Sequence, residues 1–326
     1  MSEPLPTSAL TARGDALPRR WTLHGLNNGA IFSATHRGVL FLPRQVSYAI
    51  GHVGTWLAWR LMDQTRKALA DNLRPLFPGD TDRQLERRAL RTLRGYAQDV
   101  IDFLRALRAT TEDAQQLFEA TPEDMDLFRR LLSRQRGIIL VTGHYGNWEI
   151  GSVFMRRVLE IPLTVVAMAE VNEQVNRMRR EIRDRLGTDT IEVRKSLDTA
   201  LQIRRRLAEN GVVAMLMDRH LGRDRVQVNF LNRQAAFLGT PALMGYLSEA
   251  PLLPCFIERI GPGRFRVQPG EPIFVSRELP RGEAVHTATQ AFATQLEARV
   301  RTSPHHWYQF YPYWKVQEGS YEGLMD

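Results

Sequence analysis

The pattern of hydrophobic and polar residues changes near Gly137. From Pro43 to about Arg108 apolar residues recur at helical spacing, and the LFPGD segment at residues 76–80 ends one predicted helix before another begins. After Gly137 short apolar runs alternate with amphipathic stretches. The runs are GIILV, LTVVAM, DTIEV, VVAMLM and LLPCFI, and the amphipathic stretches lie at residues 147–158, 172–186, 196–209 and 240–249.

Strands joined by crossover helices produce this alternation, so residues 137–316 are predicted to form an α/β domain. We expect a mixed, largely parallel central sheet flanked by helices, because RVQVNF and RFRVQPG have the pattern of further, partly exposed strands. Residues 37–136 are predicted to be a helical N-terminal segment. Residues 1–36, whose first 20 lack the apolar run of a signal peptide, are expected to be disordered, and residues 317–326 to form a tail.

The most apolar stretch of the N-terminal segment is QVSYAIGHVGTWLAW, residues 45–59. As a helix it spans roughly 22 Å, which is short of the ~30 Å hydrocarbon core of a bilayer. Trp56 and Trp59, with Arg44 and Arg60 at the ends, are typical of a helix lying in the membrane interface. Two interpretations remain open: a membrane-associating interfacial helix, or a helix packed on the main domain.

The net charge of the chain indicates what kind of partner it binds, but it does not distinguish among several acidic partners. The formal charge is +8, and only three of the 44 basic residues are lysines. This charge favours an acidic partner, such as a nucleic acid, an anionic membrane surface or an acidic carrier protein. The single cysteine, Cys255, excludes an intramolecular disulfide and fits a reducing compartment.

The segment TGHYGNWEI, residues 142–150, has the composition of a reactive loop. It follows the predicted strand GIILV and places His144 and Glu149 on either side of Gly146. If His144 precedes the helix and Glu149 lies in its first turns, the carboxylate can hold one imidazole nitrogen while the other accepts a proton from a hydroxyl. On these two residues alone, a structural histidine beside an acidic helix start is the favoured interpretation.

Several blocks together are more specific. The order GHYGNWE, RMRREIRDRLG, GVVAMLMDRHLG, VNFLNRQAAFLGTPAL and SPHHWYQFYPYWK, preceded by ADNLRPLFPGDTDRQLERRALR, resembles the bacterial lipid A biosynthesis (lauroyl/myristoyl) acyltransferase family. That family belongs to the lysophospholipid acyltransferase superfamily. The resemblance covers roughly residues 68–316.

The resemblance implies transfer of a fatty acyl chain from an acyl thioester to a lipid hydroxyl. The donor would be acyl carrier protein (acyl-ACP) or coenzyme A (acyl-CoA), with no further cofactor, and His144 would be the general base with Glu149 as its acidic partner. The acceptor would be a membrane lipid or glycolipid. A lipid A precursor in lipopolysaccharide biosynthesis is the first candidate; a phosphoinositide mannoside, another glycolipid or a lysophospholipid is the alternative. A peripheral or shallowly anchored location on the cytoplasmic face of the inner membrane follows.

Further candidates for substrate binding lie in the matching blocks. Arg183 could bind a phosphate through its guanidinium group, or could be a solvated helix arginine. Asp218 follows a predicted strand, and sites of α/β sheets lie at the carboxyl ends of strands. Arg219 and His220 could assist it or face water. Asn147 and Trp148 are expected to shape the loop around the base.

Other classes fit less well. The sequence has no G-x-S-x-G elbow for a serine hydrolase, and its histidines lack the spacing of a metal site, so no metal is expected. The arginines are spread along the chain without a nucleic-acid recognition motif, so no nucleic acid is expected as a partner. A lipid-binding or hydrolytic protein without acyl transfer is the alternative from another class.

Overall fold

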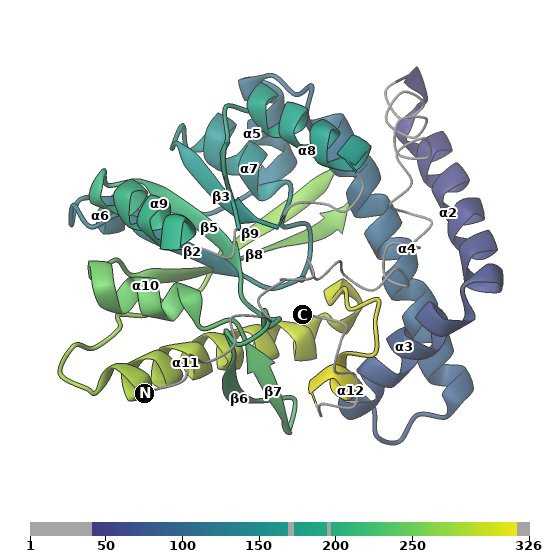
Figure 1. The fold of residues 1–326 in the computed structure, drawn as a ribbon. Helices are drawn as coiled ribbons and strands as arrows, with labels where there is room; N and C mark the ends of the chain where they lie inside the picture. Colours follow the sequence, from purple (N-terminus) through teal and green to yellow (C-terminus); the bar gives the residue numbers. More distant parts are fainter. Residues whose placement is uncertain (1–40, 169–172, 194–196, 318–326) are drawn as a thin grey trace, which may run out of the picture.

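A computed structural model describes residues 41–168, 173–193 and 197–317 (Figure 1). The predicted disordered segment 1–36 lies outside these residues, as do residues 318–326 of the predicted tail.

The described residues contain a seven-stranded sheet with the order β1-β9-β8-β2-β5-β3-β4. Its strands are β1 (Phe118–Glu119), β2 (Ile138–Thr142), β3 (Leu163–Ala167), β4 (Asp189–Glu192), β5 (Val212–Leu216), β8 (Leu252–Gly261) and β9 (Arg264–Pro269). All neighbouring strands are parallel except β8 and β9, which are antiparallel. The prediction of a mixed, largely parallel sheet is therefore confirmed.

Helices cover both faces of this sheet, and the side chains of β2 explain why. Ile139 and Val141 pack into one buried cluster, and Ile138 with Leu140 into the other. Strands buried on both faces have continuous apolar runs such as GIILV. The first cluster includes side chains from α9 (Leu197–Ala208), α10 (Thr240–Ser248) and α11 (Arg281–Thr302). The second includes side chains from α4 (Asp82–Ala106), α5 (Thr111–Leu117), α6 (Pro122–Leu132), α7 (Gly151–Val153) and α8 (Glu173–Arg185).

One predicted helix needs correction, and one long helix was not predicted. The helix expected over residues 147–158 begins only at Gly151, as α7 followed by a π-helical segment, Phe154–Val158. Residues 147–150 form the turn that precedes it. The long helix α11 was not anticipated, because its core side chains are separated by alanines and threonines that give a weak periodic signal.

The N-terminal segment forms a helical layer of α2 (Arg44–Leu61), α3 (Asp63–Leu73) and α4. Helix α4 lies between α2 and the sheet, and α2 is outermost (Figure 1). At the start of α4, Thr81 and Gln84 form a capping box. Among the described residues no helix is both long enough and apolar enough to span a bilayer.

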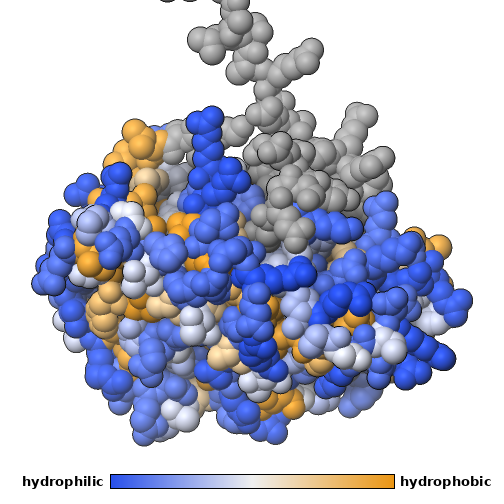
Figure 2. Space-filling model, turned by 90° about the horizontal axis from the view of Figure 1, so that it is seen from below, coloured by the Kyte–Doolittle hydropathy of each residue, from blue (hydrophilic) through white to orange (hydrophobic). Residues whose placement is uncertain are grey.

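Helix α2 has an inverted distribution of polar and apolar residues. Its buried residues are Ser47, Tyr48 and Thr55. The residues that it exposes include an apolar row at helical spacing: Val46, Ile50, Val53, Leu57 and Leu61. In contrast, the face of the molecule seen from below is mostly hydrophilic, with hydrophobic residues in separate patches (Figure 2).

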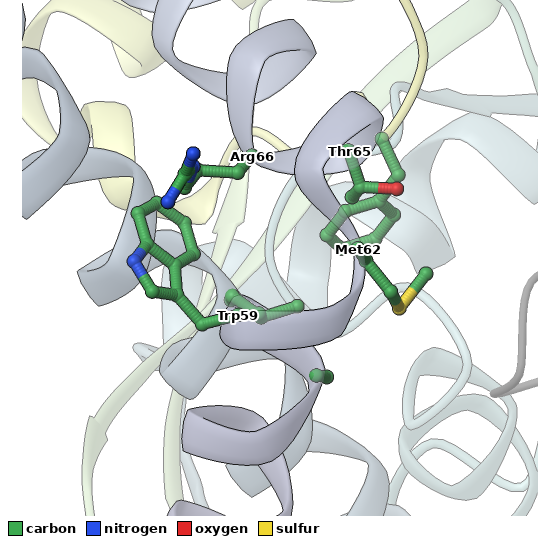
Figure 3. Close-up of a pocket in the computed structure, with 7 residues that line it drawn as sticks. Trp59, Met62, Thr65 and Arg66 are labelled. Atoms are coloured by element: carbon green, nitrogen blue, oxygen red, sulfur yellow. The ribbon is translucent and has the colours of Figure 1, made fainter.

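The junction of α2 and α3 contains a small pocket. The chain turns at Met62, and the pocket is lined by Trp59, Met62, Thr65 and Arg66 together with Ala58, Leu93 and Phe310 (Figure 3). The Arg66 guanidinium lies 6.0 Å from the centre of the Trp59 ring. Phe310 comes from the C-terminal loop, which therefore contacts the helical layer.

Asn72 of α3 fixes this C-terminal loop. Its buried side-chain amide donates to the carbonyl oxygens of Gln309 (2.9 Å) and Tyr311 (2.7 Å), and its side-chain oxygen accepts from the Tyr313 amide (3.0 Å). The polar asparagine in the segment ADNL thus binds backbone groups that are far away in the sequence. Its contacts bring the C-terminal aromatic segment to the edge of the sheet.

Candidate active site

The register of two adjacent strands brings the candidate residues together. Strands β2 and β5 are parallel, with Thr142 opposite Leu216, and the Met217 amide donates to the Thr142 carbonyl (2.8 Å). Both chains therefore leave the sheet side by side at its carboxyl edge. His144 and Asp218 each follow their strand by two residues.

His144 and Asp218 form a hydrogen-bonded pair. The distance from His144 Nδ1 to Asp218 Oδ1 is 2.7 Å, and the His144 backbone amide donates to Oδ2 (2.9 Å). The side-chain amide of Gln309 donates to the same Oδ2 (2.7 Å). The Asp218 carboxylate is fully buried, whereas the His144 side chain is 15% exposed. The Asp218 side of the pair is therefore enclosed by protein, while the His144 ring is partly accessible.

Burial and neighbouring groups shift the pKa values of both members of this pair. Burial, followed by the nearby charge of Arg219, lowers the pKa of His144 below its usual value although Asp218 opposes the shift. Burial alone would raise the pKa of Asp218, but the charge that the His144 ring carries when protonated, the hydrogen bonds from His144 and the charge of Arg219 together lower it. At neutral pH the carboxylate is thus ionised and the imidazole neutral. A carboxylate can only accept, so Nδ1 carries the proton and Nε2 retains a free electron pair.

Glycine is required in the loop that carries His144. Gly146 has a φ of +60°, and a Cβ atom there would lie 2.0 Å from the carbonyl oxygen of Ile257. Because Gly146 has no side chain, the loop can lie directly against the backbone of Ile257, and backbone hydrogen bonds form around Gly146. The Gly146 amide donates to the His306 carbonyl (2.8 Å), the Asn147 amide to the Ile257 carbonyl (2.8 Å), and the Tyr308 amide to the His144 carbonyl (2.7 Å).

A cavity adjoins this loop. It is lined by Gly146, Asn147, Trp148 and Glu149 from the loop, Tyr96, Asp99, Val100 and Phe103 from α4, Arg179, Ile182 and Arg183 from α8, and Tyr308. His144 lies next to it, with its ring edge-to-face against Trp148 at 5.2 Å between centroids. The wall contributed by α4 and Ile182 is largely apolar, and the arginines lie on α8. A cavity with these walls suits a molecule that has both an alkyl chain and an anionic group.

The expected contact between Glu149 and the His144 ring is not present, and this prediction needs correction. Asp218 occupies that place because β2 and β5 are neighbours. Glu149 lines the cavity instead, and its carboxylate lies 3.4 Å from Arg179. It is close enough for its charge to act on the pKa of His144.

The other predicted residues separate into two groups. Arg183 and Trp148 line the cavity, as does Asn147, whose side-chain amide also donates to the Asp99 carbonyl (2.9 Å). Arg219 lies behind the pair and donates to the side-chain oxygen of Gln309 (2.9 Å) and to the Tyr308 carbonyl (3.1 Å). It thus contacts the C-terminal loop. His220 is half-buried next to it.

The sequence analysis did not identify Gln309, or the cavity residues from α4 and the C-terminal loop, among them Asp99 and Tyr308. Gln309 is fully buried and binds Asp218, and Tyr308 and Asp99 line the cavity. The only signal for Gln309 is a polar residue within the aromatic run WYQFYPYW. Within the described part of the chain, no three His, Cys, Asp or Glu side chains are grouped as a metal site would require.

Comparison with known proteins gives two relevant similarities. The chain is 29% identical over 195 residues to a phosphatidylinositol mannoside acyltransferase of Mycolicibacterium smegmatis, which covers 59% of this chain and 61% of the relative. A protein of the same name from Mycobacterium tuberculosis is 25% identical over 193 residues, covering 58% of each chain. The matches thus span about three-fifths of the length of these relatives.

The family comparison covers more of the sequence. A sequence model described as bacterial lipid A biosynthesis acyltransferase matches residues 21–316, which include the helical layer, the sheet and both members of the His144–Asp218 pair. The chain therefore belongs to the bacterial lipid A biosynthesis acyltransferase family.

Proposed function

We propose that this protein transfers a fatty acyl chain from an acyl thioester to a hydroxyl group of a membrane glycolipid. The observation that carries the proposal is the His144 imidazole, held through Nδ1 by Asp218 beside a cavity with apolar and cationic walls. Family membership supports acyl transfer as the reaction class.

In the proposed reaction Nε2 of His144 accepts the proton of the acceptor hydroxyl as its oxygen attacks the thioester carbonyl. The new C–O bond forms and the C–S bond breaks. The imidazolium then returns the proton to the departing thiolate. Asp218 holds Nδ1–H throughout and stabilises the transient imidazolium. No covalent acyl-enzyme is required.

The arginines of α8 fit the phosphate groups of the proposed substrates. Acyl-ACP and acyl-CoA both carry phosphate, and a guanidinium group can donate two parallel hydrogen bonds to it. Arg183 and Arg179 line the same cavity, and the ion pair of Arg179 with Glu149 is half-exposed. We propose that Arg183 binds such a phosphate. In this proposal Glu149 orients Arg179 through their ion pair, and its charge raises the pKa of His144. The charge of +8 would favour approach of an acidic carrier protein.

For the acceptor, the relatives favour a phosphoinositide mannoside over a lipid A precursor. Two of the most similar relatives are named as phosphatidylinositol mannoside acyltransferases. The lipid A precursor remains the second candidate, supported by the description of the family.

We further propose that α2 attaches the protein to the cytoplasmic surface of the inner membrane. A helix that buries polar residues and exposes an apolar row is stable where that row contacts lipid. Arg60 lies 4.9 Å from the centre of the Trp56 ring, and α4 adds exposed arginines at positions 87, 91 and 94 that suit anionic headgroups. The membrane would supply the acceptor directly to the enzyme.

Acyl transfer can be tested with purified protein. Acyl-CoA and acyl-ACP would each be incubated with a phosphatidylinositol mannoside or a lipid A precursor, and the lipids analysed by mass spectrometry. We expect one acceptor to gain an acyl chain and His144→Ala to lower the rate by roughly 10²–10⁴-fold. Release of free fatty acid without acylated lipid would instead identify a hydrolase. An unchanged rate for His144→Ala would exclude this histidine as the base.

The two carboxylates near His144 can be distinguished by matched amide substitutions. Asp218→Asn removes the charge that fixes the imidazole, so we expect kcat to fall by at least about 100-fold. Glu149→Gln leaves the His144–Asp218 pair intact. We therefore expect kcat to fall by less than about tenfold, which is smaller than the loss expected when general-base catalysis is removed. Steady-state kinetics at saturating acceptor measure both. The opposite ranking would mean that Glu149 is the acid that acts on the base.

Membrane binding by α2 predicts a position-specific effect of charge. Val53→Glu places a carboxylate in the apolar row, and we expect binding to vesicles containing anionic phospholipid to weaken by about tenfold, because charge is costly at the interface. Leu201→Glu is the matched control: Leu201 is as exposed as Val53, both at 60%, but it lies on α9 on the other side of the molecule (Figure 1). Vesicle sedimentation gives both affinities. Equal effects of the two substitutions would refute the role of α2.

A further inference from the structure

Two buried aspartates on α4 lie between the helical layer and the candidate active site. Asp99 and Asp102 are 3% and 2% exposed, and their spacing places them on the same face of the helix. Buried carboxylates are rare unless they are paired and hydrogen-bonded. Their partners therefore indicate what each one holds.

Asp99 contacts the site. One carboxylate oxygen accepts from Arg259 Nε (3.0 Å) and the other from the Tyr308 hydroxyl (2.5 Å). Its backbone carbonyl accepts from the side-chain amide of Asn147 (2.9 Å). Asn147 lies on the loop of His144, and Tyr308 lies on the C-terminal loop, where its backbone amide donates to the His144 carbonyl.

Asp102 contacts α2 and the β8–β9 turn. It accepts a hydrogen bond from the Tyr48 hydroxyl, pairs with Arg44 Nε (3.2 Å) and accepts from the Gly263 amide (3.3 Å). Asp102 is also a buried aspartate of α4, like Asp99. Its side chain, however, binds α2 and the β8–β9 turn and not the loops of the candidate active site. The two aspartates therefore form a natural pair of test and control.

The charges around Asp99 balance only when it is ionised. Burial raises the pKa of Asp99 to about 6, against the opposing influence of Arg259, so the carboxyl is mostly ionised at neutral pH. Arg259 is itself largely buried. An uncharged side chain at position 99 would leave this guanidinium without its closest counter-charge, and a buried charge without a partner is strongly destabilising.

We infer that Asp99 is a positioning residue: its carboxylate anchors Tyr308 to α4, and Tyr308 in turn holds the loop that carries His144 through its backbone amide. The backbone carbonyl of Asp99 adds a second contact to this loop through Asn147. This inference rests on the proposed function where it concerns catalysis, but the loop geometry can be measured without any substrate. The Asp99 carboxylate orients the base through Tyr308 and does not transfer the proton itself.

Hydrogen exchange of the full-length protein, followed by mass spectrometry, tests the anchoring directly. The Gly146, Asn147 and Tyr308 amides are hydrogen-bonded within the segments that Asp99 holds. We expect Asp99→Asn to raise exchange at least fivefold in peptides covering residues 143–150 and 304–310. Asp102→Asn should raise exchange around residues 44–50 and 261–264, and leave residues 143–150 unchanged.

Kinetics supply the second readout. We expect Asp99→Asn and Tyr308→Phe each to lower kcat at least tenfold while KM for the acceptor changes less than threefold. Asp102→Asn should leave kcat within threefold at temperatures where both proteins remain folded. Uniform exchange increases in both aspartate variants, or equal losses of kcat, would overturn the inference. If the wild-type protein transfers no acyl group, the proposed function fails, while the exchange pattern still decides whether Asp99 anchors the loop.

Discussion

The candidate active site depends on one hydrogen-bonded pair, His144 Nδ1 with Asp218 Oδ1 at 2.7 Å. The pair exists because β2 and β5 are parallel neighbours whose carboxyl ends lie side by side. A buried carboxylate requires such partners, and among the described residues Asp218 has the imidazole, the His144 amide and the Gln309 side chain. The sheet, the C-terminal loop and the base are thus coupled through a single charged group.

The helical layer completes the site from the other side. Asn72 of α3 fixes the backbone of the C-terminal loop that presents Gln309, and Asp99 of α4 binds Tyr308 and Asn147. The same layer carries the apolar row of α2 on its outer side. One layer therefore contributes both the proposed membrane contact and part of the cavity wall, which suits an enzyme whose acceptor would come from the bilayer.

Much of the fold could be predicted because its signals are local. The apolar runs after Gly137 are bounded by turn residues, and they correspond to strands in the structure. The residues of the pair could also be named, since each follows a strand of an α/β sheet. Their pairing could not, because strand order is not written in local sequence. Glu149, five residues from His144, was therefore preferred over Asp218, which is 74 residues away.

The remaining omissions have the same cause. Asp99 and Gln309 have no recognisable motif, and their roles depend on contacts across 209 and 91 residues of chain. The sequence shows that α2 contains many apolar residues, but only the structure shows that several of them are exposed while polar residues of the helix are buried. Long-range polar contacts thus carry the information that local patterns lack.

The role of the His144–Asp218 pair is tested most directly by the protonation state of the His144 ring. Long-range ¹H–¹⁵N correlation spectra of the imidazoles, with His144 assigned from the His144→Gln spectrum, report each ring nitrogen as a function of pH. We predict a neutral ring at pH 7 with the proton on Nδ1 and a titration midpoint below the usual 6.5, as burial dictates. A proton on Nε2, or an imidazolium at pH 7, would contradict the account.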